Sequence, residues 1–194
     1  MSRKSEIKRK TAETDISIEL NLDGEGRYKI ETPIGFFNHM IELLAKHALF
    51  DIKVTANGDI EVDSHHLIED MGICLGKAIK DALGDKSGIR RYGFFILPMD
   101  ESLCRIAIDI GGRPYLIYKT RVLKEIRREL DLYKNFFTAF ATSLGANIHI
   151  SVLYGDDLHH CVESIFKALG RSLRQAIGLD EREKSIPSSK GRID

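Results

Sequence analysis

The sequence predicts an α+β fold made of two similar halves, each a roughly four-stranded sheet with helices on one face. Apolar and polar residues alternate over 16–22 and 104–110, which is typical of half-buried strands. Stretches with helical apolar spacing follow in each half, and the motif His-His-x-x-Glu occurs at 65–69 and again at 159–163. We therefore expect one domain of two pseudo-repeats, about 1–92 and 93–179, whose helix layers pack together.

In the first half, the turn 23–26 leads into a second strand at 27–31, so we expect a hairpin there. Pro33 and Gly35 interrupt the pattern, and apolar residues at helical spacing over 37–48 predict a helix. The strand 52–56, the turn Asn57-Gly58 and the segment 59–63 predict a second hairpin. Ser64 is placed to cap the helix that opens with the first motif, and Gly84 suits its end.

The second half repeats this order. After the strand at 104–110, Gly111-Gly112 leads into a strand at 113–119, and apolar spacing over 132–144 predicts a helix that stops at Gly145. A strand at 148–154 precedes the helix that opens with the second motif. The charged segment 120–129 is interpreted as a solvated loop or an exposed helix, and 180–194 as a polar tail that carries Ser188-Ser189-Lys190.

Composition narrows the class of protein. The 29 basic and 29 acidic residues cancel, so nothing favours nucleic acid or an acidic membrane as a partner. The first ten residues have no apolar core, and no apolar run is long enough to cross a bilayer. Three widely spaced cysteines predict no disulfide framework and favour a reducing, cytoplasmic location. Cys161, inside the second motif, is interpreted as a buried thiol, with metal ligation as the alternative.

The repeated motif points to metal binding. On a helix, Glu69 lies one turn from both His65 and His66, so a carboxylate and an imidazole share a face and can coordinate one cation. Adjacent residues differ by roughly 100° around a helix, so the two histidines diverge and each can serve a different metal. Two such motifs predict a pair of metals on a duplicated scaffold.

His39 stands at the start of the first predicted helix, where a partner of the motif helix would approach. A site of His66, Glu69 and His39 would mix nitrogen and oxygen ligands, which suits manganese, iron or zinc and favours manganese. Four-helix di-metal carboxylate proteins use the order Glu-x-x-His and long helices, so this sequence of many strands excludes them.

A second group of residues suits a phosphate dianion, which arginine forks and lysine charges bind well. Its members are Arg90, Arg91, Arg113, Lys167, Ser188, Ser189 and Lys190.

Over nearly its whole length the chain resembles the imidazoleglycerol-phosphate dehydratase family of histidine biosynthesis. The matching segments are 9–14 (RKTAET), 35–40 (GFFNHM), 63–70 (DSHHLIED), 91–93 (RYG), 98–101 (PMDE), 112–115 (GRPY), 159–163 (HHCVE) with 166–168 (FKA), and 187–191 (PSSKG). The resemblance implies elimination of water from imidazoleglycerol phosphate to give imidazole-acetol phosphate. It also implies a small-molecule phosphate substrate and a homo-oligomeric shell of 24 subunits, with two manganese ions per active site at subunit interfaces.

The resemblance also implies roles for individual residues. One metal would be held by His39, His66, Glu69 and His159, and the other by His65, His160 and Glu163. Catalytic roles would fall to Glu13, the acid/base residue, and to His65 and Glu163. Substrate contacts would come from Glu13, His39, His47, Arg91, Arg113, Lys167, Ser188, Ser189 and Lys190.

Two positions depart from the family pattern. Asn38 stands where the family usually has Asp, and Asn135 stands where it has a histidine ligand of the second metal. An amide is a weaker ligand than imidazole, so we expect one metal to bind tightly and the second loosely. Both departures favour an alternative, a catalytically weakened or inactive relative that keeps a metal-bound shell, whereas the retained phosphate-binding residues favour catalysis. A two-metal phosphohydrolase would need more aspartates than this sequence offers.

Overall fold

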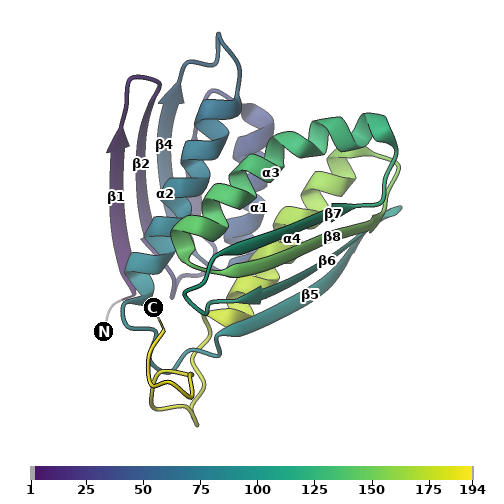
Figure 1. The fold of residues 1–194 in the computed structure, drawn as a ribbon. Helices are drawn as coiled ribbons and strands as arrows, with labels where there is room; N and C mark the ends of the chain where they lie inside the picture. The colour runs from purple at the N-terminus through teal and green to yellow at the C-terminus, as the bar shows by residue number, and fades with distance from the viewer. Residues whose placement is uncertain (1–2, 194) are drawn as a thin grey trace.

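A computed structural model of the chain, which describes residues 3–193, has two four-stranded mixed sheets with helices between them (Figure 1). The first sheet has the order β1 (Lys4–Lys10), β2 (Thr14–Asn21), β4 (Asp51–Gly58) and β3 (Tyr28–Glu31). The second has the order β5 (Tyr92–Met99), β6 (Ser102–Asp109), β8 (Asn147–Tyr154) and β7 (Tyr115–Thr120). This arrangement confirms the predicted α+β class.

The strand register shows the duplication directly. In the first sheet Val54 lies between Ile18 on the antiparallel side and Ile30 on the parallel side. In the second sheet Ile150 lies between Ile106 and Tyr118 in the same two senses. Because strand order and register both recur, each half is a copy of one β-β-β-α-β-α unit.

The helices α1 (Gly35–Ala48), α2 (His65–Leu83), α3 (Lys124–Leu144) and α4 (Leu158–Ala176) form the interior layers. α1 packs on α4 and α2 packs on α3, so the helices of one half contact those of the other, as predicted. At the centre the rings of Phe37, Phe136 and Phe166 are fully buried, with centroids 5.5–6.4 Å apart. This core brings the starts of α1 and α4 together. Across residues 3–193, no helix combines the length and apolarity that a membrane span requires.

The prediction of hairpins in the first half was wrong. The strand at 28–31 pairs with β4 in parallel, with α1 as the crossover, rather than with β2. Asn57-Gly58 belongs to β4, and 59–63 contains a turn, closed by the Val62 amide donating to the Asp59 carbonyl, rather than a strand. This irregular segment leads to α2, where Asp63, not Ser64, accepts the first free amide, that of His65.

The two outer strands β1 and β5 were not predicted. β1 buries only Ile7, and β5 exposes Phe94 and Ile96 on its outer face, so neither strand alternates apolar inward residues with polar outward residues. α3 begins at Lys124, inside the charged segment that was interpreted as a loop or an exposed helix. Its charged first turns are amphipathic, since Ile126 and Leu130 are buried.

Candidate metal centre and active site

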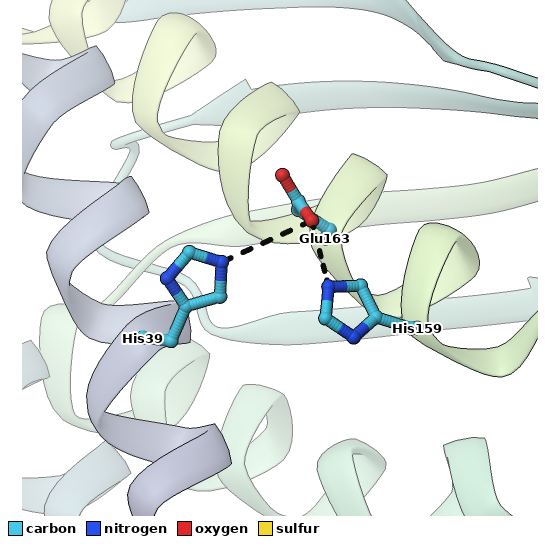
Figure 2. A group of neighbouring side chains, drawn as sticks. All are labelled: His39, His159 and Glu163. Carbon is cyan, nitrogen blue, oxygen red and sulfur yellow. Dashed lines mark hydrogen bonds and ion pairs between the residues drawn. The ribbon is translucent and has the colours of Figure 1, made fainter.

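His39, His159 and Glu163 converge where α1 meets α4 (Figure 2). A Glu163 carboxylate oxygen lies 3.0 Å from His159 Nε2 and 3.9 Å from His39 Nε2. One ligand atom from each residue lies within 4.8 Å of the other two, and within residues 3–193 this is the one group with such geometry. Two imidazoles and a carboxylate are a donor set that fits manganese, iron or zinc.

Local structure explains how the three side chains meet. His159 and Glu163 are one turn apart on α4, so both project from the same face. The Asp157 side chain caps α4 by accepting the His160 amide at 3.0 Å, which sets where the helix starts. The ring of Phe36 packs edge-on against His159 with centroids 5.1 Å apart, so the imidazole faces α1.

Glu163 is a buried carboxylate held in its charged form. Burial by itself raises its pKa, but the hydrogen bond and charge of Lys167, 2.5 Å away, outweigh burial, and His39 and His159 add to the lowering. The net pKa lies below the ordinary value, so Glu163 is an anionic ligand at neutral pH. Lys167 is thereby placed beside the metal candidate and also contacts Met99 Sδ at 3.4 Å.

His160 points away from this group and contacts the β5–β6 turn. Its Nδ1 lies 2.7 Å from Glu101, and its Nε2 lies 3.5 Å from Asp100. The hydrogen bond to Glu101 raises the pKa of His160, and the same bond is the main cause that lowers the pKa of Glu101 to about 2. Sequence reasoning assigned Glu101 no role, although it lies inside the matching segment 98–101.

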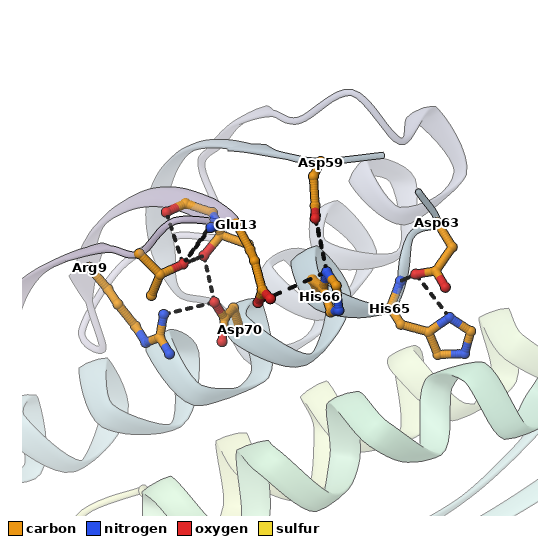
Figure 3. Close-up of polar contacts among 9 residues, drawn as sticks. Arg9, Glu13, Asp59, Asp63, His65, His66 and Asp70 are labelled. Atoms are coloured by element: carbon orange, nitrogen blue, oxygen red, sulfur yellow. Dashed lines mark hydrogen bonds and ion pairs between the residues drawn. The ribbon is translucent and has the colours of Figure 1, made fainter. Parts of the chain in front are cut away.

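The first motif builds a different cluster at the start of α2 (Figure 3). His66 Nδ1 lies 3.1 Å from both oxygens of Asp59 and 3.9 Å from Glu13. The hydrogen bond to Asp59 is the main cause that raises the pKa of His66. His65 turns toward Asp63, 3.2 Å from its Nδ1, so the two adjacent histidines diverge as their helical positions require.

A single chain does not assemble either metal set that the family resemblance implies. His39 joins His159 and Glu163, whereas Glu69 faces a separate cavity of 330 Å³ between α2 and α3, which Asn135 also lines. The implied sets assign His159 and Glu163 to different metals, although here the two share a hydrogen bond. The division of ligands between two metals stays a prediction.

Asn135 is the repeat equivalent of His39. α1 ends in a left-handed cap at Leu49 and α3 ends in one at Gly145, and in each helix the residue ten positions before the cap is His39 or Asn135. His39, from the first half, faces the motif of α4 in the second half, and Asn135, from the second half, lines the same cavity as Glu69 of α2 in the first half. The substitution therefore removes an imidazole from one of two equivalent places.

The predicted phosphate ligands gather in part. A cavity of 310 Å³ is lined by Arg91, Arg113, Ser188, Ser189 and Lys190. Arg91 is oriented by Asp109, which accepts from its Nε at 2.7 Å, and by the Pro187 carbonyl, 2.9 Å from Nη1. This links the C-terminal segment to the second sheet. The cavity concentrates cationic and hydroxyl groups in the way an anionic ligand requires.

Lys167 and His47 lie apart from that cavity. His47, on α1, is half-buried, and burial followed by the charges of Lys167 and Arg171 lowers its pKa. It is therefore a neutral imidazole beside two cations at neutral pH. The structure brings these two predicted substrate contacts to the α1–α4 side, next to the metal candidate.

Comparison with known proteins identifies the family of this chain. The family model of imidazoleglycerol-phosphate dehydratase matches residues 32–173. Proteins of that name from Caldanaerobacter subterraneus and Geobacter sulfurreducens are 53% and 50% identical, over 97% and 100% of this chain and 98% and 100% of their own lengths.

Two solved structures share the fold. The crystal structure of imidazoleglycerol-phosphate dehydratase from Staphylococcus aureus superposes with a TM-score of 0.80 at 32% identity, over 91% of this chain and 99% of the other. The enzyme from Pyrococcus furiosus, solved in complex with (S)-C348, also gives 0.80, at 34% identity over 96% and 99%. The chain therefore belongs to the imidazoleglycerol-phosphate dehydratase family, a family of hydro-lyases.

Proposed function

We propose that this protein eliminates water from imidazoleglycerol phosphate to give imidazole-acetol phosphate, a step of histidine biosynthesis. The observation that carries the proposal is the convergence of His39, His159 and Glu163 on one point between α1 and α4. A hydro-lyase that acts on an imidazole substrate needs a group that stabilises negative charge on the ring. Bound manganese supplies that stabilisation as a Lewis acid, and this donor set suits it.

The chain's own residues supply binding and proton transfer. Arg91, already oriented by Asp109, would hold the substrate phosphate together with Arg113 and the 188–190 segment. Glu13 would transfer the proton at carbon. Within residues 3–193 no hydrogen bond to its carboxylate is found, and its side chain is 55% exposed, so a substrate can reach it.

We infer two manganese ions per active site, with the second held more weakly. The second motif contributes His159 and Glu163 beside His39, whereas among residues 3–193 Glu69 of the first motif lines a cavity with Asn135 and with no imidazole. Asn135 stands where that imidazole would be, and an amide oxygen replaces a nitrogen donor poorly. Activity should therefore require more free manganese than two complete sites would.

We also propose that copies of this chain assemble, as in the shell of 24 subunits that the family resemblance implies, and the incomplete metal sets of one chain support this. Within residues 3–193 the histidines of α2 contact acidic side chains but belong to no metal-binding group, so ligands from a second copy would complete them. The outer face of β5 exposes Tyr92, Phe94 and Ile96 by 54–69%, an apolar strip that another subunit would cover.

Three buried, unpaired thiols suit a reducing cytoplasm.

The proposal is tested by following imidazole-acetol phosphate formation with metal-free protein and increasing manganese. Turnover that appears with manganese and is lost on chelation is expected. Absence of turnover at every manganese concentration, with metal still bound to an intact assembly, would instead favour the alternative that Asn135 suggests, a weakened relative that keeps only the metal-bound shell.

A further inference from the structure

Two glutamates occupy the same place in the two halves of the fold. Glu13 directly precedes β2 and Glu101 directly precedes β6, each at the end of a hairpin turn. Each turn lies beside the second histidine of the neighbouring motif, His66 in one half and His160 in the other. Duplication would therefore give both glutamates the same contact, but their contacts differ.

In the second half both carboxylate oxygens of Glu101 have hydrogen-bond partners. Glu101 Oε2 lies 2.7 Å from His160 Nδ1, and Oε1 accepts from the Ser102 hydroxyl at 2.9 Å and from the Asp157 amide at 3.0 Å. A carboxylate can only accept, so the neutral His160 ring carries its proton on Nδ1. Its Nε2, which lies 3.5 Å from the exposed carboxylate of Asp100, then carries the lone pair that can bind a metal. This is the arrangement found in carboxylate–histidine–metal triads.

In the first half Asp59, rather than the turn glutamate, contacts the second histidine of the motif. Both of its oxygens lie 3.1 Å from His66 Nδ1. Asp59 directly follows β4, and its repeat equivalent directly after β8 is Gly155. A Cβ at Gly155 would collide with Ser102 Oγ and Cys161 Sγ, so the second half has no room for a carboxylate there. In the second half the turn glutamate, Glu101, therefore contacts the histidine instead.

Because Asp59 contacts His66, Glu13 is not needed to orient that histidine. The turn that carries Glu13 is held by neighbours instead: the Thr11 hydroxyl accepts the amides of Glu13 and Thr14, and the Thr14 hydroxyl donates to buried Asp70. The Glu13 carboxylate stands 3.9 Å from His66 Nδ1, beyond hydrogen-bond distance. Glu13 is thus held beside His66, at the start of α2, without a hydrogen bond to that histidine.

From these contacts we propose that the carboxylates of the two repeats have different roles. Glu101 and Asp59 are positioning residues that orient His160 and His66, respectively, toward metal. Glu13 alone keeps a reactive carboxylate. The assignment of Glu13 rests on the proposed function, whereas that of Glu101 and Asp59 rests on metal binding. The substituted carboxylates should therefore separate into two classes by manganese affinity.

The experiment is manganese titration by calorimetry of the full-length protein, comparing E101Q, D59N and E13Q with the wild type. E19Q is the matched control, because Glu19 lies on the outer face of the first sheet and pairs there with Lys53 at 2.8 Å. Loss of a carboxylate that supports a ligand histidine typically costs about 10–100-fold in metal affinity. We expect that loss in E101Q and D59N, and unchanged affinity in E13Q and E19Q.

A second readout needs no metal. In nitrogen-15 spectra of metal-free protein, at a pH where the rings are neutral, His160 and His66 should carry the proton on Nδ1. Protons on Nε2, or full manganese affinity in E101Q and D59N with normal melting temperatures, would overturn the proposal. So would an equal loss of affinity in E13Q. If the wild type failed to turn over substrate while the affinity pattern held, only the proposed function would fall.

Discussion

Gly170 on α4 lies directly against the main-chain carbonyl of Leu44 on α1. A Cβ at Gly170 would stand 2.8 Å from that oxygen and 3.0 Å from the Cβ of His47. The first repeat has the same device, because a Cβ at Gly76 on α2 would stand 2.6 Å from the Phe140 carbonyl on α3. The missing side chain at Gly170 sets the separation of the two helices that carry His39 and Glu163.

The G170A variant should therefore separate α1 from α4. Overpacking of this kind costs about 1–3 kcal/mol of unfolding free energy, and it should also weaken manganese binding because His39 moves away from His159 and Glu163. Denaturant unfolding and calorimetry check both effects. G35A is the control, since a Cβ at Gly35 meets nothing within 4 Å. Wild-type stability and affinity in G170A would show that this contact does not set the site.

Replacing Asn135 should strengthen the weaker metal. N135H places an imidazole at the repeat equivalent of His39, in the cavity that Glu69 also lines. We expect the free manganese needed for half-maximal turnover to fall about tenfold, equivalent to about 1.4 kcal/mol of binding free energy. N135Q keeps the amide and should bring no such gain. An unchanged requirement in N135H would remove Asn135 as the cause of weak binding.

The turn that carries Glu13 depends on a partly buried ion pair. Arg9 Nη1 lies 2.7 Å from Asp70 Oδ2, which also accepts from the buried Thr14 hydroxyl. D70N leaves a partly buried guanidinium without its charge partner, and we expect a loss of about 2 kcal/mol in unfolding free energy by urea denaturation. D15N removes an exposed pair with Lys10 from the same hairpin and should change little. Equal effects of the two variants would contradict this account.

Acid should weaken the β3 side of the first sheet through Asp51. A hydrogen bond from Arg27, joined by the amides of Glu25 and Arg27, lowers the pKa of Asp51 far below its ordinary value. Because the folded pKa is depressed, the stabilisation is fully present above the unfolded pKa, about 3.9, and is lost progressively as the pH falls below it. D51N should therefore be less stable than wild type at neutral pH, and the gap should close below about pH 4. Denaturation midpoints measured across this range would refute the assignment if the gap stayed constant.

How far the sequence predicts this structure depends on the kind of information involved. The duplicated α+β class follows from alternation and from the repeated motif, which are local patterns. The pairing of β3 with β4 is not local, because the turn before β3 resembles a hairpin turn and only the crossover through α1 makes the pair parallel. β1 escaped prediction because its outer face is charged and it buries a single residue, Ile7.

The site divides in the same way. The spacing of His159 and Glu163 predicts that they share a helix face, and the structure agrees. That His39 joins this motif rather than the one in its own half follows from the packing of α1 on α4, which no sequence pattern reveals. Glu101 went unnoticed for a related reason: its role depends on the crowding at Gly155, a contact between residues distant in the chain.

The most direct test of the account is an anomalous difference map from crystals grown with manganese. We predict an anomalous peak that marks a manganese ion coordinated by the ring nitrogens of His39 and His159 and by a carboxylate oxygen of Glu163. Manganese bound elsewhere, with these three side chains contacting no ion, would contradict it.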